Sequence, residues 1–306
     1  MTGPARPVVP PSRPGYSLGP MSRPPTFTPP ACATSRVLRT ERGDFAVLDA
    51  VPANAPARAT ALLLPGYTGS KEDFIALLEP LCAAGYRVVA VDGRGQYESE
   101  GTDRQETYAQ GELARDVLAQ AAALAGGEGA LHLLGHSLGG QIARAAVLLD
   151  ATPFRSLTLM SSGPAEVVAA QRDKVKMLSD ALSVLTMDEV WEAMRALDPP
   201  QDADTGDGED MRRRWLRHHP AQLIATGAQL SAEPDRVDEL AALGLPVHVL
   251  SGERDDVWPV EQFDAMARRL GAHRTMIAGA EHSPNTARPH ESAEALAAFW
   301  DGVPAD

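Results

Sequence analysis

The chain has 306 residues, 44% of them hydrophobic and 23% charged, which is typical of a globular protein with one large α/β domain or two smaller ones. Its formal net charge of −13 disfavours nucleic acid or an anionic membrane as a partner, and no apolar stretch approaches the roughly 20 residues that cross a bilayer. The only two cysteines, Cys32 and Cys82, do not make a disulfide framework, so the reducing cytoplasm is the expected location.

Residues 1–34 are predicted to form a disordered tail. Proline occupies ten of the first 30 positions, a density that excludes a helix or a central strand, and no continuous apolar region marks a secretory signal. We expect a partly polyproline II segment, and we expect removal of residues 1–30 to change stability and turnover little. Two alternatives stay open: a ligand for an SH3-type domain, and a translation start at Met21.

Strand and helix patterns alternate after this tail. Short apolar strands are predicted at 35–40, 44–51, 59–65, 86–92, 130–135, 154–162, 245–252 and 272–279, the first two as an antiparallel pair. Amphipathic helices are predicted at 71–85, 106–127, 138–150, 260–271 and 290–303. This alternation predicts an α/β fold with a mostly parallel central sheet that helices cover on both faces.

The alternation is interrupted after the sixth predicted strand. Helical patterns follow at 165–185, 187–197 and 211–230, the last two separated by a polar loop, and this region contains no good strand. We therefore predict a core formed by residues 35–164 and 231–306, with a helical cap, or lid, at 165–230.

A serine lies between glycines where the fifth predicted strand turns into a helix. The stretch "GHSLG" at 135–139 matches G-x-S-x-G, in which small flanking residues leave room for a sharp turn that exposes the hydroxyl of Ser137. Taken alone, a glycine-rich turn with a capping serine is the alternative. A hydroxyl becomes a nucleophile only beside a base, and the base needs a carboxylate to orient it.

Both partners follow predicted strands, at the edge where a parallel sheet gathers its reactive groups. His282 comes after the last strand, and Asp255 and Asp256 come after the strand before it. The order serine, aspartate, histidine is the one described for this kind of turn. Spacing alone leaves both aspartates open as the acid. The histidines and cysteines show no metal-ligand spacing, and no metal or other cofactor is predicted.

With these motifs the chain resembles the α/β-hydrolase family over nearly everything after the tail. "GHSLGG" is similar to the family's nucleophile elbow, "GERDDVWP" to its acid loop and "GAEHSPN" to its histidine loop. The resemblance implies that Ser137, Asp255 and His282 are the catalytic residues.

Two further loops are similar to the family pattern, with one departure each. "LLLPGYTGS" resembles the H-G-x-x-G-S oxyanion loop, but Pro65 replaces the histidine; the resemblance implies that the N–H groups of Tyr67 and Leu138 form the oxyanion hole. "VDGRGQYES" resembles the D-x-R-G-x-G-x-S stretch that shapes the site, but Tyr97 stands where glycine is usual.

A serine nucleophile without a cofactor indicates acyl transfer to water. We predict a carboxylesterase-like hydrolase acting on a small to medium, largely apolar ester, a small-molecule substrate. Trp258 beside the acid loop, and Met187 and Trp191 in the cap, are the candidate pocket residues, although at least half of the cap's apolar residues are expected to be its own core. The alternatives are a C–C bond hydrolase, a thioesterase, a lactonase, and a non-catalytic ligand receptor on the same fold.

Overall fold

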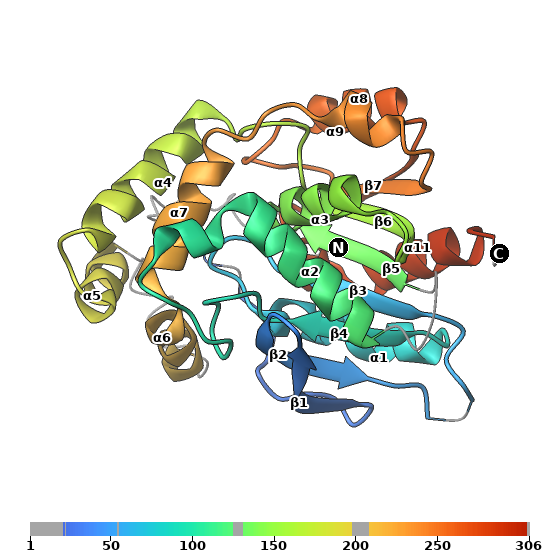
Figure 1. Ribbon diagram of the computed structural model, residues 1–306, viewed down its shortest axis with the longest axis horizontal. Helices are drawn as coiled ribbons and strands as arrows, with labels where there is room; N and C mark the ends of the chain where they lie inside the picture. The colour runs from blue at the N-terminus through green and yellow to red at the C-terminus, as the bar shows by residue number, and fades with distance from the viewer. Residues whose placement is uncertain (1–20, 22, 54, 125–130, 198–207, 305–306) are drawn as a thin grey trace, which may run out of the picture.

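An eight-stranded sheet forms the centre of the protein, in the order β1-β2-β4-β3-β5-β6-β7-β8 (Figure 1). The computed structural model describes residues 21, 23–53, 55–124, 131–197 and 208–304. The strands are β1 (Ala33–Thr40), β2 (Gly43–Ala50), β3 (Thr60–Leu64), β4 (Arg87–Val91), β5 (Leu131–His136), β6 (Phe154–Met160), β7 (Val247–Gly252) and β8 (His273–Ile277). β2 runs antiparallel to β1 and β4, and the other neighbours are parallel, so the predicted mostly parallel sheet is confirmed.

The burial of each strand follows its place in the sheet. β5 is buried along its whole length, and β3 is buried from Ala61 onward, because helices cover both faces of these inner strands. Continuous apolar runs therefore form the inner strands. β1, at the edge, has Leu38 as its one buried residue and exposes most of the others.

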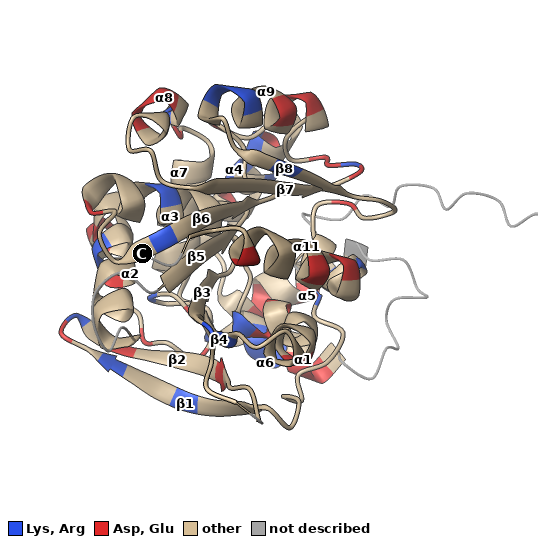
Figure 2. Ribbon diagram, turned by 90° about the vertical axis from the view of Figure 1, so that its right-hand side faces the viewer, with Lys and Arg blue, Asp and Glu red and all other residues tan. Residues whose placement is uncertain are grey.

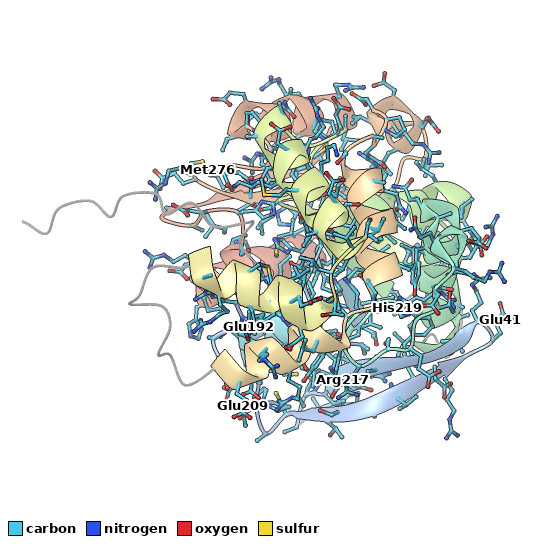
Figure 3. All side chains as sticks on the ribbon, turned by 90° about the vertical axis from the view of Figure 1, so that its left-hand side faces the viewer. Glu41, Glu192, Glu209, Arg217, His219 and Met276 are labelled. Atoms are coloured by element: carbon cyan, nitrogen blue, oxygen red, sulfur yellow. The ribbon has the colours of Figure 1, made fainter. Side chains whose placement is uncertain are left out.

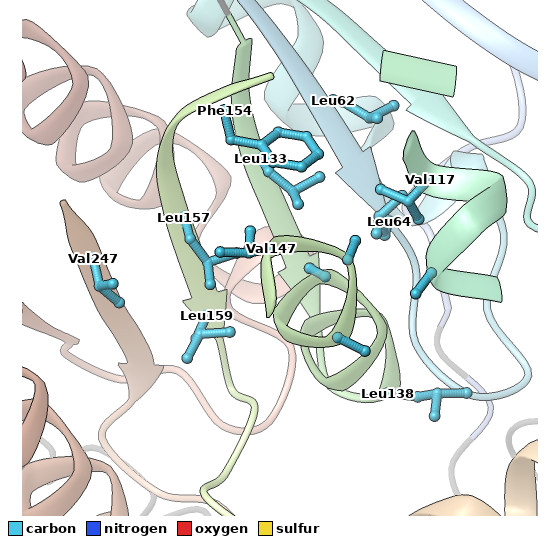
Figure 4. Close-up of a cluster of buried hydrophobic side chains, with 14 of the residues drawn as sticks. Leu62, Leu64, Val117, Leu133, Leu138, Val147, Phe154, Leu157, Leu159 and Val247 are labelled. Atoms are coloured by element: carbon cyan, nitrogen blue, oxygen red, sulfur yellow. The ribbon is translucent and has the colours of Figure 1, made fainter. Parts of the chain in front are cut away.

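Helices form a layer on each face of the sheet. One layer contains α2 (Gln110–Leu124), α3 (Leu138–Leu149), α8 (Val237–Ala241) and α9 (Val260–Leu270); the other contains α1 (Ile75–Ala83) and α11 (Pro289–Asp301). In the first layer, Val117 and Val147 lie among leucines of β3, β5 and β6 (Figure 4). α9 contains both acidic and basic residues (Figure 2). α8 falls in a stretch for which the sequence predicts no element.

Four further helices lie between β6 and α8 in the chain: α4 (Ala169–Leu182), α5 (Met187–Leu197), α6 (Gly208–Arg217) and α7 (Pro220–Leu230). We call them the cap helices. They gather on one side of the molecule, where Glu192 marks α5 and Arg217 marks α6 (Figure 3). They occupy the range predicted for the cap, and residues 198–207 of the predicted polar loop lie outside the described residues. No helix in the described ranges is long and apolar enough to cross a membrane.

The segment before β1 differs from the prediction of a tail that extends to residue 34. β1 begins at Ala33, Pro24 is buried, and Met21 and Phe27 pack against the cap helices. The remainder of the predicted tail, residues 1–20 and 22, lies outside the described residues. Apolar side chains at positions 21 and 27 explain the difference, because a proline-rich chain can still bury the few apolar groups that it carries.

Candidate active site

The candidate nucleophile stands on a sharp turn between β5 and α3. Ser137 has φ of 53° and ψ of −120°, a region that residues with a Cβ rarely adopt. Glycines permit this turn: a Cβ on Gly135 would lie 2.2 Å from the Gly139 oxygen, and a Cβ on Gly139 would lie 2.4 Å from the Leu64 oxygen. Because real Cβ atoms essentially never approach so closely, these positions require glycine. The turn places Ser137 at the carboxyl end of β5.

The structure brings the side chains of Ser137, His282 and Asp255 together. His282 Nε2 lies 3.0 Å from Ser137 Oγ, and His282 Nδ1 lies 2.8 Å from Asp255 Oδ2. The Asp255 side chain is 0% exposed and that of His282 is 18% exposed. With Nδ1–H donating to the carboxylate, Nε2 is left as the acceptor that faces the serine hydroxyl. In this arrangement an imidazole can take the serine proton and a carboxylate can stabilise the resulting cation.

The loop after β7 distinguishes the two neighbouring aspartates. Asp255 Oδ1 accepts hydrogen bonds from the backbone N–H groups of Val257 (2.8 Å) and Trp258 (3.1 Å), which leaves Oδ2 for His282. Asp256 is exposed, and its Oδ2 accepts from Gln171 Nε2 of α4 at 3.0 Å. The geometry therefore selects Asp255 as the partner of the histidine.

Two backbone amides suited to an oxyanion lie beside the serine. Leu138 N–H is the first amide of α3, at the positive end of the helix dipole. Tyr67 follows Gly66, on which a Cβ would lie 3.2 Å from Ser137 Cβ. Neither amide donates to a protein acceptor within the part of the chain that the structure describes. Both are therefore available to a ligand oxygen.

A glutamine supports the oxyanion loop, in which Pro65 stands in place of the family's histidine. Gln96 Nε2 donates to the Gly66 carbonyl at 3.1 Å, and Gln96 Oε1 accepts from Gly93 N–H at 2.9 Å. Gln96 is buried, so water does not compete for these bonds. The sequence indicates only that the stretch around it shapes the site. Tyr97, where glycine is usual, takes a positive φ of 36°.

The side chain of Tyr67 connects the oxyanion loop to a cap helix. Its hydroxyl donates to the Leu223 carbonyl of α7 at 3.1 Å. A Cβ on Gly227 of α7 would lie 3.0 Å from the same hydroxyl, so the helix passes close to the phenol. Burial raises the pKa of Tyr67 above its ordinary value, which keeps the phenol protonated and able to donate. The position of α7 is thereby linked to that of the loop.

The side chain of His136, next to the serine, contacts the backbone of the histidine loop. The sequence gives it no role, because neighbouring residues at a sharp turn point apart. In the structure His136 Nε2 lies 2.9 Å from the His282 carbonyl oxygen. Burial, together with the nearby His282, lowers the pKa of His136 to about 4, so the ring is neutral and its one proton must lie on Nε2 for this bond to form. The hydrogen bond to the His282 carbonyl shows that His136 supports the histidine loop, and no sequence motif indicates this role.

A buried ion pair fixes α6 to the core near the histidine loop. Arg214 Nη1 lies 2.7 Å from Asp73 Oδ1, and both side chains are 0% exposed. The Asp73 carbonyl accepts from Asn285 Nδ2 at 2.7 Å, three residues beyond His282. An isolated charge here would be costly to bury, so the two groups depend on each other.

A second buried charge cluster anchors the start of the 92–99 loop. The Lys71 ammonium lies 2.9 Å from Asp92 Oδ2 and 2.7 Å from Glu98 Oε2. Burial alone would lower the pKa of Lys71, but the carboxylates of Asp92 and Glu72 raise this pKa above its ordinary value. Lys71 therefore stays an ammonium ion, and it links this loop to the segment that follows the oxyanion loop.

The three candidate pocket residues do not share one environment. Trp258 is 0% exposed, and its Nε1 donates to the backbone oxygens of Ala165 (3.0 Å) and Glu166 (3.1 Å), with its ring centroid 6.1 Å from that of His282. The Trp258 side chain therefore packs in the core and supports the acid loop, and its role in a substrate pocket stays a prediction. Trp191 and Met187 lie in the apolar cluster of the cap helices.

Among the described residues, no group of three or more histidine, cysteine, aspartate or glutamate side chains is arranged to hold a metal ion.

The chain is similar to known hydrolases in sequence and in structure. The model of the "Alpha/beta hydrolase family" matches residues 61–295. A pimeloyl-[acyl-carrier protein] methyl ester esterase of Aeromonas hydrophila subsp. hydrophila is 28% identical over 176 residues, which are 55% of this chain and 69% of that protein. Among solved structures, a thermophilic esterase from Thermogutta terrifontis has a TM-score of 0.70 at 22% identity, covering 89% of this chain and 99% of that one. A structure described in a study of carboxylesterases from Nitrososphaera gargenis has a TM-score of 0.69 at 19% identity, covering 88% and 98%.

The structural likenesses, at these identities, show the fold. The family match covers most of the chain, and the chain therefore belongs to the alpha/beta hydrolase family. A hydrolytic role is supported by this membership and by the esterase of Aeromonas hydrophila.

Proposed function

We propose that the protein is a serine hydrolase that cleaves a carboxylic ester, or a related acyl bond, of a small to medium, largely apolar substrate. The observation that carries the proposal is the continuous hydrogen-bonded series from Ser137 Oγ to His282 Nε2 (3.0 Å) and from His282 Nδ1 to Asp255 (2.8 Å). The name of the Aeromonas relative specifies a methyl ester, which supports an ester bond as the target.

The first half of the reaction forms an acyl-serine. His282 Nε2 takes the Ser137 proton as Oγ attacks the carbonyl carbon, and the buried carboxylate of Asp255 stabilises the imidazolium. The amides of Leu138 and Tyr67 donate to the oxyanion of the tetrahedral intermediate. When the intermediate collapses, Nε2 returns its proton to the leaving oxygen, an alcohol departs, and the acyl group stays on Ser137.

The second half releases the acyl group to water. His282 Nε2 takes a proton from a water molecule, whose oxygen attacks the acyl carbon, and the oxyanion again forms at the two amides. Collapse breaks the bond to Ser137, and Nε2 gives the proton back to the serine oxygen. The products are a carboxylic acid and the free enzyme, so no cofactor enters the balance.

A fluorophosphonate probe tests the activated nucleophile directly. We expect the wild type to be labelled at Ser137, and Ser137→Ala to lose labelling and at least about 10⁴-fold of its p-nitrophenyl ester hydrolysis. Ser35→Ala, at an exposed position of β1, is the matched control and should behave as the wild type. A wild type that is neither labelled nor active on any ester would favour a non-catalytic receptor on this fold and would overturn the proposal.

A panel of matched esters and thioesters defines the bond. Each pair carries the same acyl group, so that only the leaving atom differs. We expect higher kcat/KM for the ester of each pair after correction for the intrinsic reactivity of the two bonds. A consistent preference for the thioester would instead assign the protein as a thioesterase with the same Ser137-based mechanism.

A further inference from the structure

The segment before β1 reaches the apolar side of the cap helices. Met21 and Phe27 pack against one cluster of buried cap residues, and Pro24 between them is buried. The cluster comprises Leu178, Leu182, Val190, Trp191, Met211, Trp215 and Leu223. The chain therefore runs along the cap rather than away from the protein at this point.

The same cluster extends to the oxyanion loop. Tyr67, whose amide is an oxyanion donor under the proposed function, packs against this cluster as Met21 and Phe27 do. Its hydroxyl also donates to Leu223 O at 3.1 Å. A single apolar surface thus contacts both the N-terminal segment and the loop beside Ser137. An acyl chain attached to Ser137 and directed towards the cap would meet this surface.

Phe27 also contacts the buried arginine of α6. Its ring centroid lies 5.9 Å from the guanidinium carbon of Arg214, a cation–π distance. Arg214 is bound to Asp73 at 2.7 Å, and Asn285, three residues beyond His282, donates to the Asp73 carbonyl. Three successive contacts, through Arg214 and Asp73, therefore connect Phe27 with Asn285.

The segment is anchored at its far end as well. Val51 N–H donates to the Cys32 carbonyl at 3.0 Å, and β1 begins at the next residue. Prolines at positions 24, 25, 29 and 30 restrict the backbone between the two anchors, so little entropy is lost in holding it. Because the segment is held at both ends, we expect it to keep its position when a substrate binds near it.

We propose that Met21 and residues 23–27 form one side of the acyl site, with Phe27 limiting the length of the acyl chain. The proposal rests on the proposed serine hydrolase function and adds a specificity-determining residue outside both the sheet and the cap helices. Removing the Phe27 ring would free room for about two more methylene groups, worth roughly tenfold in kcat/KM for a chain that fills the space.

The test is a chain-length profile of the full-length protein with p-nitrophenyl esters from acetate to laurate. In Phe27→Ala we expect the preferred acyl chain to lengthen by at least two carbons, with about a tenfold gain at that length and acetate hydrolysis within twofold of wild type. Phe27→Trp keeps the site filled and should shorten the preferred chain. Thr28→Ala, at the exposed neighbouring position, should keep the wild-type profile.

Each outcome separates this inference from the proposed function. If kcat/KM of the variants changes by one common factor at every chain length, acetate included, the inference that Phe27 limits the acyl chain is wrong. This holds for a common loss through misfolding and for a common gain through easier access to the site. A wild type that hydrolyses no ester and resists the fluorophosphonate would overturn the proposed function, and this inference with it. Fluorophosphonate labelling together with parallel profiles would overturn this inference alone.

Discussion

Replacing each of the two neighbouring aspartates by asparagine distinguishes a member of the triad from a surface residue. Asp255→Asn keeps an oxygen for the amides of Val257 and Trp258, so the loop retains both bonds. The new NH₂ group then faces His282 Nδ1, which must become an acceptor. The proton moves to Nε2, and the ring can no longer take the proton of Ser137.

The expected magnitude follows from what each side chain touches. Loss of the reactive tautomer with the geometry intact costs about 10⁴-fold in kcat, equal to about 5.4 kcal/mol of transition-state stabilisation. Asp256 is exposed and binds only Gln171 among the described residues, and an asparagine oxygen can keep that bond. A surface change of this kind costs about 0.5 kcal/mol or less, which is within about threefold.

The assay is p-nitrophenyl butyrate hydrolysis, with thermal unfolding to show that both variants are folded. Under the proposed mechanism Asp255→Asn is nearly inactive with an unchanged Tm, and Asp256→Asn resembles the wild type. Equal losses in the two variants, or a greater loss in Asp256→Asn, would refute the assignment of the acid.

Three further predictions concern the turn, the oxyanion loop and pH. Gly139→Ala places a Cβ 2.4 Å from the Leu64 oxygen and should lower the free energy of unfolding by about 3 kcal/mol or more. The control Gly208→Ala, at a position with open space around it, should be neutral or slightly stabilising. Equal urea midpoints for the two variants would contradict this prediction. Gln96→Leu removes the side-chain hydrogen bonds to the Gly66 carbonyl and from Gly93 N–H, and leaves the Gly66 carbonyl only its bond from Gly69 N–H among the described residues. We expect kcat to fall by about tenfold with KM nearly unchanged, and a change confined to KM would argue against a role in the oxyanion loop. Burial lowers the pKa of His132, His136 and His218 from 6.5 to about 4. Between pH 6.5 and 4 the unfolded chain therefore binds protons that the folded chain does not, so the urea midpoint should fall as pH decreases through this window. A urea midpoint that stays constant from pH 7 to 4.5 would contradict this prediction.

Much of the fold could be predicted because it depends on local patterns. The eight predicted strands all exist, and those of the parallel core differ from the observed bounds by one or two residues, since short apolar runs between helices have few other arrangements. The three side chains of the candidate triad come together as the motifs imply, because parallel strands deliver their following loops to one edge.

The remaining features depend on contacts between distant parts of the chain. Gln96 donates to the Gly66 carbonyl, 30 positions earlier in the chain. Phe27 contacts Arg214, which follows it only after β1 to β6 and two cap helices, and no local sequence pattern predicts either pair. Trp258 was a pocket candidate because it follows the acid loop, but its burial is set by the backbone of residues 163–166, on which a Cβ at Gly163 would collide with its ring. Proximity in sequence gave no information about which way that ring points.

The uneven attachment of the cap helices has a consequence for how new specificities can arise. α6 and α7 are bound to core loops by Arg214 to Asp73 (2.7 Å), His219 N–H to the Gly95 carbonyl (2.8 Å) and Tyr67 to the Leu223 carbonyl (3.1 Å). α5 instead packs on α4 and α6. Under the proposed function, we therefore expect substitutions on α5 to reshape the apolar cluster with little movement of the two proposed oxyanion amides, and those on α6 and α7 to alter rate and selectivity together. In divergence or in a directed library, we expect selectivity to change most independently of catalytic rate through α5.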